Sequence, residues 1–127
     1  MGIEINLLKN YPVTKRDTSA RANEKTKEDR EIARKFGKDF FDGDRKHGYG
    51  GFNYFSRFWE PVVPTFKDYW SLDSNSSLLD VGCAKGFMLF DFKRLIPGIK
   101  VQGVDISEYA INHALPEVKD QIMVADA

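Results

Sequence analysis

The chain of 127 residues has one cysteine, two histidines and no net charge. A single cysteine excludes an internal disulfide framework, and no cluster of Cys, His and acidic residues has the spacing of a metal site. No apolar run approaches the roughly 18 residues of a membrane-spanning helix, and no signal-sequence pattern begins the chain. Zero net charge implies no general attraction to nucleic acid or membranes. We therefore expect no metal, no membrane or nucleic-acid partner, and a cytoplasmic location.

Hydrophobic residues make up 42% of the chain, which suits one globular domain at this length. In the second half of the chain, short apolar runs alternate with helical patterns. Strands are expected at 78–82, 99–105 and 121–125, and helices at 85–96 and 108–115. Ser107 is a suitable N-cap for the second of these helices. Short strands that alternate with helices predict parallel βαβ units. The fold class is therefore α/β, a Rossmann-like parallel sheet with flanking helices.

The most informative motif is LLDVGCAKGF, residues 78–87, followed by VQGVDIS. It has the pattern of a buried strand, a turn of small residues and the start of a helix. Gly82 and Gly86 allow the backbone to come close to a ligand at the helix N-terminus, where N–H groups point outward. Asp105 lies 19 residues after Gly86, about where such units carry an acid that binds ribose. The motif predicts a site for an adenosine-bearing cofactor.

The turn lacks the G-x-G-x-x-G pattern that admits a pyrophosphate. Asp80, two residues before Gly82, would repel a pyrophosphate but suits a ligand with an ammonium and a sulfonium group. DVGCAKG resembles the first motif, (D/E)-x-G-x-G-x-G, of the class I S-adenosylmethionine-dependent methyltransferases. The resemblance covers roughly residues 77–127. Ala84 stands where this family most often has glycine, and alanine is tolerated there if its φ stays negative.

The resemblance implies S-adenosylmethionine as cofactor and a role for each motif residue. Asp80 and the loop from Gly82 through Cys83 and Ala84 to Gly86 would hold the methionine part. Asp105 would accept hydrogen bonds from both ribose hydroxyls, with Ile106 beside the cofactor. Asp126 would meet the adenine amino group, and the backbone N–H of Ala127 would lie near the ring. The catalytic residues stay unknown, because the family's substrate contacts normally follow the third strand.

The implied reaction is methyl transfer to a small-molecule acceptor, since no basic patch favours nucleic acid. Two alternatives remain: a nicotinamide-binding Rossmann half, and a non-catalytic, truncated module that binds cofactor weakly or pairs with another chain. The family's sheet has seven strands, so we interpret the chain as the N-terminal part of a longer protein that begins at Met1 and is truncated after the third strand. The open edge of strand 78–82 would then allow self-association.

We divide the chain into 1–57, a helical and loop extension acting as a lid or substrate element, and 58–127, the N-terminal half of the methyltransferase Rossmann-like domain. Apolar residues at every fourth position, Ile32, Phe36 and Phe40, predict one helix over 26–42. Thr26 and Asp29 resemble a capping box, and Gly43 would end the helix. This helix could pack on the domain, close over the site or bind RNA; its mixed charge argues against RNA.

The segment HGYGGFNYF, residues 47–55, interleaves glycines with aromatic residues. Its aromatic side chains either fill the core or shape the cofactor or acceptor pocket, where ring faces can stack on adenine or attract a sulfonium. Tyr49 is the first candidate for the pocket, followed by Phe52. After this segment we expect a helix over 58–70 with Pro61 at its first position. The side chains expected to pack on the sheet are Val62, Val63, Phe66, Tyr69 and Trp70.

Overall fold

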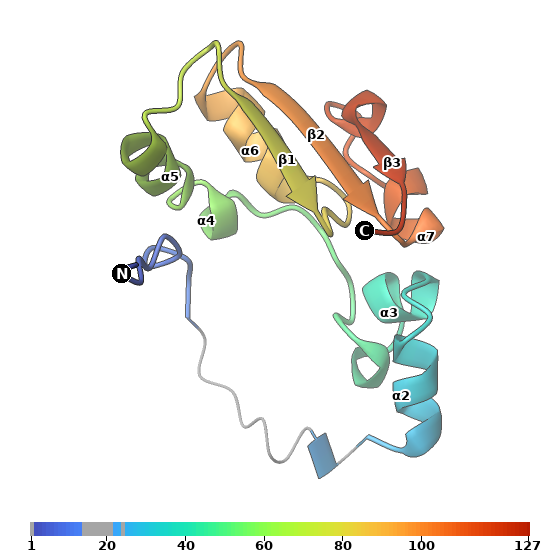
Figure 1. The fold of residues 1–127 in the computed structure, drawn as a ribbon. Helices are drawn as coiled ribbons and strands as arrows, with labels where there is room; N and C mark the ends of the chain where they lie inside the picture. Colours follow the sequence, from blue (N-terminus) through green and yellow to red (C-terminus); the bar gives the residue numbers. More distant parts are fainter. Residues whose placement is uncertain (1, 14–21, 24) are drawn as a thin grey trace.

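The computed structural model describes residues 2–13, 22–23 and 25–127 (Figure 1). Its centre is a parallel sheet of three strands in the order β1-β2-β3. The strands are β1 (Ser77–Val81), β2 (Lys100–Asp105) and β3 (Ile122–Val124). With its flanking helices, this sheet confirms the predicted Rossmann-like α/β fold. Within the part of the chain that the structure describes, β1 forms one edge of the sheet.

One face of the sheet is covered by α6 (Phe87–Leu95) and α7 (Glu108–Asn112). Leu89 and Phe92 of α6 are completely buried, and the core continues through Val101 and Ile122 of the sheet. On the other face, three apolar strand residues are more than half exposed: Leu79 at 60%, Val81 at 56% and Met123 at 61%. The alternating side chains of the strands therefore separate a packed face from an open one.

Helix α7 begins as expected but ends earlier than the predicted residue 115. The Ser107 side chain accepts a hydrogen bond from Ala110 N at 3.0 Å, which confirms Ser107 as the N-cap. The helix ends at Asn112 because the chain turns toward the β1–α6 connection, where Leu115 N donates to Lys85 O at 3.1 Å. Pro116 also disfavours helical geometry at the residue before it. A short 3-10 helix, η2 (Lys119–Gln121), leads into β3.

The predicted single helix over 26–42 is wrong: the structure has α2 (Lys27–Ala33) and α3 (Lys38–Asp42). The capping box of Thr26 and Asp29 and the stop at Gly43 are confirmed. Between the two helices Phe36 adopts a left-handed conformation with φ of 50°. Its carbonyl accepts a hydrogen bond from the Ser107 hydroxyl, so the break docks this segment on α7. A 3-10 helix, η1 (Arg45–His47), follows α3.

The predicted helix over 58–70 is also divided, into α4 (Ser56–Trp59) and α5 (Val63–Trp70). Pro64, not Pro61, occupies the first turn of α5, where its missing N–H has no helical partner to lose.

The expected packing of this segment is confirmed for Val62 and Val63, which are buried, and for Phe66, whose ring lies 5.5 Å from that of Phe92. Tyr69 and Trp70 are more than half exposed, so their predicted place in the core is wrong. Since α5 ends at Trp70, these two side chains lie at the end of the helix rather than over the sheet.

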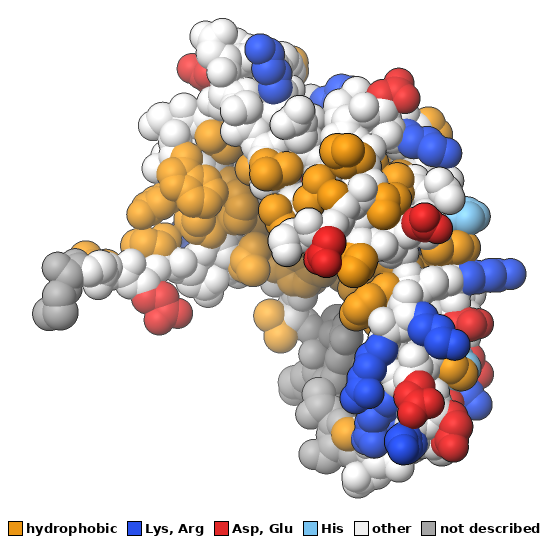
Figure 2. Space-filling view, turned by 45° about the vertical axis from the view of Figure 1, so that its right-hand side comes forward, with side chains coloured by type: hydrophobic (Ala, Val, Ile, Leu, Met, Phe, Trp, Pro, Cys, Tyr) orange, Lys and Arg blue, Asp and Glu red, His pale blue; other side chains and the backbone are white. Residues whose placement is uncertain are grey.

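In the described ranges no helix has both the length and the apolar composition to cross a membrane. Figure 2 shows a dense group of charged side chains at the lower right, where α2 lies in Figure 1, and hydrophobic side chains gathered above this group. The charged surface around α2 is therefore separate from the apolar surface above it.

Candidate functional site

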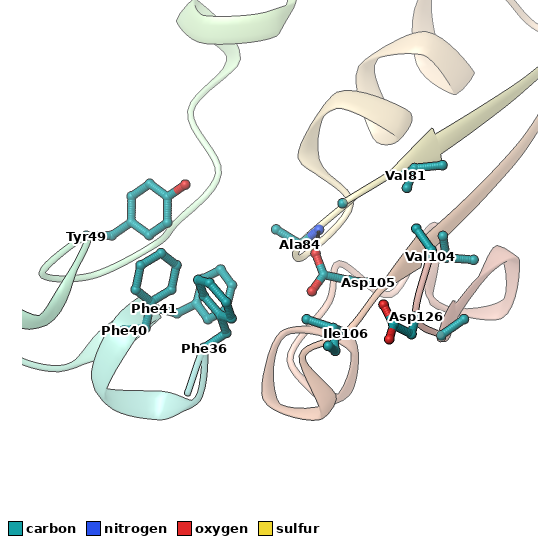
Figure 3. Close-up of a pocket in the computed structure, with 13 residues that line it drawn as sticks. Phe36, Phe40, Phe41, Tyr49, Val81, Ala84, Val104, Asp105, Ile106 and Asp126 are labelled. Atoms are coloured by element: carbon teal, nitrogen blue, oxygen red, sulfur yellow. Dashed lines mark hydrogen bonds between the residues drawn. The ribbon is translucent and has the colours of Figure 1, made fainter. Parts of the chain in front are cut away.

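A pocket of about 350 Å³ lies at the carboxyl ends of the three strands. Ligands of open α/β sheets bind at this edge. We call its two sides the strand-end wall and the aromatic wall; they face each other in Figure 3. The strand-end wall includes Val81, Gly82, Ala84, Val104, Asp105, Ile106, Ala125, Asp126 and Ala127. The aromatic wall consists of Phe36, Phe40, Phe41 and Tyr49.

Many residues predicted to bind a cofactor line this pocket. They are Gly82, Ala84, Asp105, Ile106, Asp126 and Ala127, and the loop candidate Tyr49 lies opposite them. Asp80, Cys83 and Gly86 do not line it, and neither does the second loop candidate, Phe52. The sequence pattern does not predict the three phenylalanines of the aromatic wall, because Phe36 and Phe40 fall on one stripe of a single predicted helix.

Gly82 combines a left-handed backbone with open space beside it. Its φ is 87°, and a Cβ placed there would meet no atom within 4 Å. Its N–H and that of Cys83 both donate to Val104 O, at 2.8 and 3.0 Å, so the turn is fixed to the end of β2. The open side of Gly82 therefore gives a ligand close access to a rigid backbone.

Ala84 departs from the expectation that its φ stays negative. Its φ is 50°, in the left-handed region. Its N–H donates to Asp105 Oδ2 at 2.8 Å, which holds the residue in this conformation. The preference of related turns for glycine at this position has a direct cause here, because a Cβ makes the left-handed conformation unfavourable.

The Cys83 side chain lies in the core below the turn, and the backbone of Gly86 is buried there as well. Cys83 is buried, and burial, followed by the charges of Asp80 and Asp105, raises the pKa of its thiol to about 12. A Cβ on Gly86 would lie 2.6 Å from Val118 Cγ2. Gly103, which the sequence reasoning did not single out, is packed as closely: a Cβ there would lie 2.8 Å from Cys83 Sγ. These residues pack the turn against the sheet instead of facing a ligand.

The Asp105 carboxylate lies where β2 ends. Oδ2 accepts the Ala84 N–H and Oδ1 accepts the Ser107 N–H, both at 2.8 Å. Each carboxylate oxygen has a second lone pair that can accept from a ligand hydroxyl. Backbone donors therefore fix the orientation of Asp105 while it keeps the capacity to bind a diol.

Carboxylates dominate the charge of the site. Asp105 and Asp126 line the pocket, and its described lining contains no Lys or Arg. Asp80 lies beneath the turn, where burial, and then the charge of Asp105, raise the pKa of its carboxyl. Burial is the larger cause, and the smaller part of the shift reflects repulsion between the neighbouring carboxyl groups of Asp80 and Asp105. The pocket thus favours a cationic ligand over an anionic one.

The aromatic wall is a packed layer of rings. Phe41 is 3% exposed and stacks on Tyr49, with ring centroids 5.8 Å apart. Phe52 lies 4.4 Å from Tyr49 and 4.5 Å from Phe87, so it supports Tyr49 from behind and joins the wall to α6. This position explains why Phe52 is outside the pocket although it belongs to the same loop.

An ion pair between a buried lysine and a half-buried aspartate attaches the aromatic wall to the sheet domain. Lys85 Nζ lies 2.7 Å from Asp42 Oδ2 and donates to Phe52 O at 2.8 Å. Asp42 also accepts from Phe52 N at 2.9 Å and from the Tyr109 hydroxyl at 2.5 Å. We call these four residues the Asp42–Lys85 cluster. Lys85 stands inside the glycine motif, yet its side chain turns away from the pocket and fixes α3 and its loop.

Burial of Asp42 opposes its ionisation, but the hydrogen bonds from Lys85, Phe52 and Tyr109 outweigh this and lower its pKa to about 2. The hydrogen bond to Asp42, together with burial, raises the pKa of Tyr109 to about 12. At neutral pH Asp42 is therefore a carboxylate and Tyr109 a neutral phenol.

The two histidines have local roles. His47 Nε2 lies 3.0 Å from Asp29 Oδ1, and the His113 ring stacks on Tyr109 with centroids 4.0 Å apart. Neither lines the pocket. Groups of three or more His, Cys, Asp or Glu arranged to hold a metal are absent from the described part of the chain.

Comparison with known proteins gives a family match over the segment that contributes most of the strand-end wall. Residues 72–122 match the family model described as "Methyltransferase domain". No curated protein matches the chain. The crystal structure of the MccD protein is similar with 25% sequence identity and a TM-score of 0.44, over 50% of this chain and 31% of that one. The chain thus spans about a third of the MccD chain. The resemblance that DVGCAKG indicates is confirmed as a similarity: residues 72–122, which include this motif, match the methyltransferase-domain model.

Proposed function

We propose that this chain binds S-adenosylmethionine in the pocket at the strand ends and takes part in methyl transfer to a small-molecule acceptor. The observation that carries the proposal is the negative charge of the pocket opposite a wall of aromatic rings. A sulfonium and an ammonium are attracted both by carboxylates and by ring faces. A pyrophosphate would be repelled by the same carboxylates. This favours S-adenosylmethionine over the nicotinamide alternative.

The residues present fit the parts of this cofactor. The open side of Gly82 leaves room for a ligand against the turn, because a Cβ at this position would meet no atom within 4 Å. The remaining lone pairs of Asp105 suit two ribose hydroxyls. Asp126 and the Ala127 backbone, farther along the same wall, would meet the adenine. Asp80 would act through its charge, because it lies outside the lining.

When bound, S-adenosylmethionine supplies an electrophilic methyl group on a sulfonium. The chain's own part is to bind and orient it: Asp105 fixes the ribose, and the aromatic wall limits the access of water. Methyl transfer depends mainly on holding acceptor and methyl in line. The Asp42–Lys85 cluster contributes by keeping the aromatic wall in place. The small-molecule nature of the acceptor, the cytoplasmic location and self-association through the β1 edge stay predictions.

Calorimetry with S-adenosylmethionine and NAD on the chain and on Asp105→Asn tests the proposal. We expect saturable binding of S-adenosylmethionine, no binding of NAD, and affinity at least about tenfold lower in Asp105→Asn, since hydrogen bonds to a charged group are each worth about 1.5–3 kcal/mol. Asp120→Asn is the matched control, because Asp120 is exposed and outside the pocket. Tighter binding of NAD, or no cofactor binding by a chain folded by circular dichroism, would contradict the proposal.

The non-catalytic alternative needs a separate measurement. Transfer of a radiolabelled methyl group from the bound cofactor to any acceptor in a metabolite extract would exclude it. Binding without transfer, in a preparation that binds cofactor stoichiometrically, would favour it.

A further inference from the structure

A second pocket, of about 470 Å³, adjoins the first. Tyr49 lines both pockets. The second pocket is formed by Tyr11 of the N-terminal segment, Arg45 of η1, the loop after Tyr49, and α4. Small-molecule sites in proteins typically occupy roughly 300–1,000 Å³ and combine apolar walls with a few polar groups. The second pocket has this size and composition.

Aromatic rings form most of its walls. Tyr11 meets Trp59 edge-on with ring centroids 5.0 Å apart, and Phe52 joins Tyr49 at 4.4 Å. Phe55, also in the lining, is 55% exposed. Rings from separate segments of the chain therefore converge on one space with part of their surface uncovered. A flat ring system would bury this surface, and pairing between aromatic rings adds to the gain from burial alone.

The charge of the second pocket is opposite to that of the first. Arg45 and Arg57 line it, and its described lining has no Asp or Glu. Neither arginine forms an ion pair with a residue that the structure describes, whereas Arg94 nearby in the fold pairs with Glu60 and Asp91. The Arg57 guanidinium lies 4.3 Å from the centroid of the Phe58 ring. Two guanidinium groups without a carboxylate favour a ligand with a carboxylate or phosphate group.

We propose that this second pocket is the acceptor site, and that the acceptor is a planar ring molecule with an anionic group. The ring would lie among Tyr11, Phe55 and Trp59, with its anionic group toward Arg45 and Arg57. The inference rests on the proposed function, because Tyr49 is where this site meets the cofactor pocket. In the transfer, an acceptor oxygen or nitrogen forms a bond to the methyl carbon as the carbon–sulfur bond breaks. The electron pair of that bond goes to sulfur, and the acceptor's proton passes to water.

Calorimetry on the full 127-residue chain tests the chemical class with four probes. Naphthalene-2-carboxylate and 2-naphthyl phosphate both carry a planar ring and an anionic group. Their comparison shows whether the site prefers a carboxylate or a phosphate. Naphthalene-2-carboxamide keeps the ring without the charge, and cyclohexanecarboxylate keeps the charge without the flat ring. We expect at least one of the first two to bind about tenfold more tightly than the last two, a difference typical of one charge-assisted contact.

Arg45→Gln and Arg57→Gln locate the site. Each should weaken binding of the anionic planar probe about tenfold and leave its neutral amide unchanged, because each removes one charged partner. Lys46→Gln is the matched control, since Lys46 is an exposed cation of η1 beside Arg45 but outside the lining. Arg45→Lys and Arg57→Lys, which keep the charge, should restore part of the affinity.

S-adenosylhomocysteine binding, measured on the same samples, separates this inference from the proposed function. Retained affinity for S-adenosylhomocysteine in both glutamine variants supports an acceptor site. If the affinity for S-adenosylhomocysteine falls in these variants while their melting temperature is unchanged, the arginines bind the cofactor's own carboxylate, and the inference is overturned. Equal binding of the carboxylate and the amide by the unaltered chain also overturns it, while the proposed function stands if S-adenosylhomocysteine binds. Probe binding without S-adenosylhomocysteine binding overturns the acceptor role.

Discussion

At the scale of single residues, Ala84 carries the clearest strain in the site. Its left-handed φ of 50° is held by the hydrogen bond from its N–H to Asp105 and by the turn around it. An L-residue with a Cβ pays roughly 1–2 kcal/mol in this conformation, which glycine avoids. The strain fixes the donor to Asp105 at the centre of the strand-end wall.

Ala84→Gly should therefore stabilise the chain. Relief of the strain is partly offset by the greater entropy of glycine in the unfolded state, so we expect a net gain of about 0.5–1 kcal/mol in the free energy of unfolding. Urea unfolding followed by circular dichroism measures it. A loss of stability would mean that the Ala84 methyl makes contacts worth more than the strain, contrary to this account.

Asp80 is expected to make stability depend on pH. Burial and the charge of Asp105 raise its pKa in the folded chain above the ordinary 3.8, so the folded state binds the proton more tightly than the unfolded state. The free energy of unfolding should then fall as the pH rises from 3.8 through the raised pKa. Asp80→Asn should abolish this fall and raise stability at pH 7 while weakening cofactor binding. The free energy of unfolding of both chains is measured by urea unfolding between pH 4 and pH 7. If it depends on pH in the same way in Asp80→Asn as in the unaltered chain, Asp80 is not the cause of the fall.

At the scale of elements, the N-terminal extension shows what local sequence patterns can and cannot predict. The capping box at Thr26 and the stop at Gly43 are local signals, and both were predicted correctly. The break at Phe36 was not, because its carbonyl bonds to Ser107, 71 residues away. A stripe with helical periodicity contains no information about such a distant partner. The break allows Phe36, Phe40 and Phe41 to line the pocket. Because the break is not predictable from the local pattern, the aromatic wall is not predictable either.

The Asp42–Lys85 cluster should control both the stability of this extension and its response to acid. Lys85→Met leaves the Asp42 carboxylate without its ammonium partner; we expect a loss of about 2 kcal/mol, below the range for fully buried pairs because Asp42 is partly exposed. Asp42→Asn combined with Lys85→Met should cost less than the two single losses added. Lys38→Met, at an exposed lysine of α3, is the control. Additive losses in urea unfolding would mean that the pair is not coupled.

The same cluster sets a pH window. Asp42 has its pKa lowered from 3.8 to about 2, so its stabilising contribution is complete above pH 4 and is lost as the pH falls from about 4 to 2. Asp42→Asn should remove this part of the acid transition. Thermal melting at pH 2.5 and pH 6 for both chains measures the difference; an equal loss of melting temperature in the two chains would assign the acid sensitivity to other groups.

At the scale of the whole molecule, the parallel sheet and the strand-end wall were predictable, because a βαβ unit places its turn and its strand ends on one edge. The deviations have local packing causes: Cys83 and Gly86 face the core since Gly103 and Val118 come close beneath the turn. The aromatic wall depends on contacts between distant parts of the chain, and so does the second pocket, in which Tyr11 meets Trp59. Local sequence patterns do not reveal such contacts.

We propose that the cofactor lies between the strand-end wall and the aromatic wall. The most direct test is a titration of the ¹⁵N-labelled chain with S-adenosylhomocysteine, followed by two-dimensional NMR. We expect saturable shifts of backbone amides on the strand-end wall, at Gly82, Ile106 and Ala127, and on the aromatic wall, at Phe40 and Tyr49. Amides at the opposite end of the sheet, such as those of Lys100 and Gln121, should not move. Shifts confined to that end, or no shifts in a chain with a folded spectrum, would contradict it.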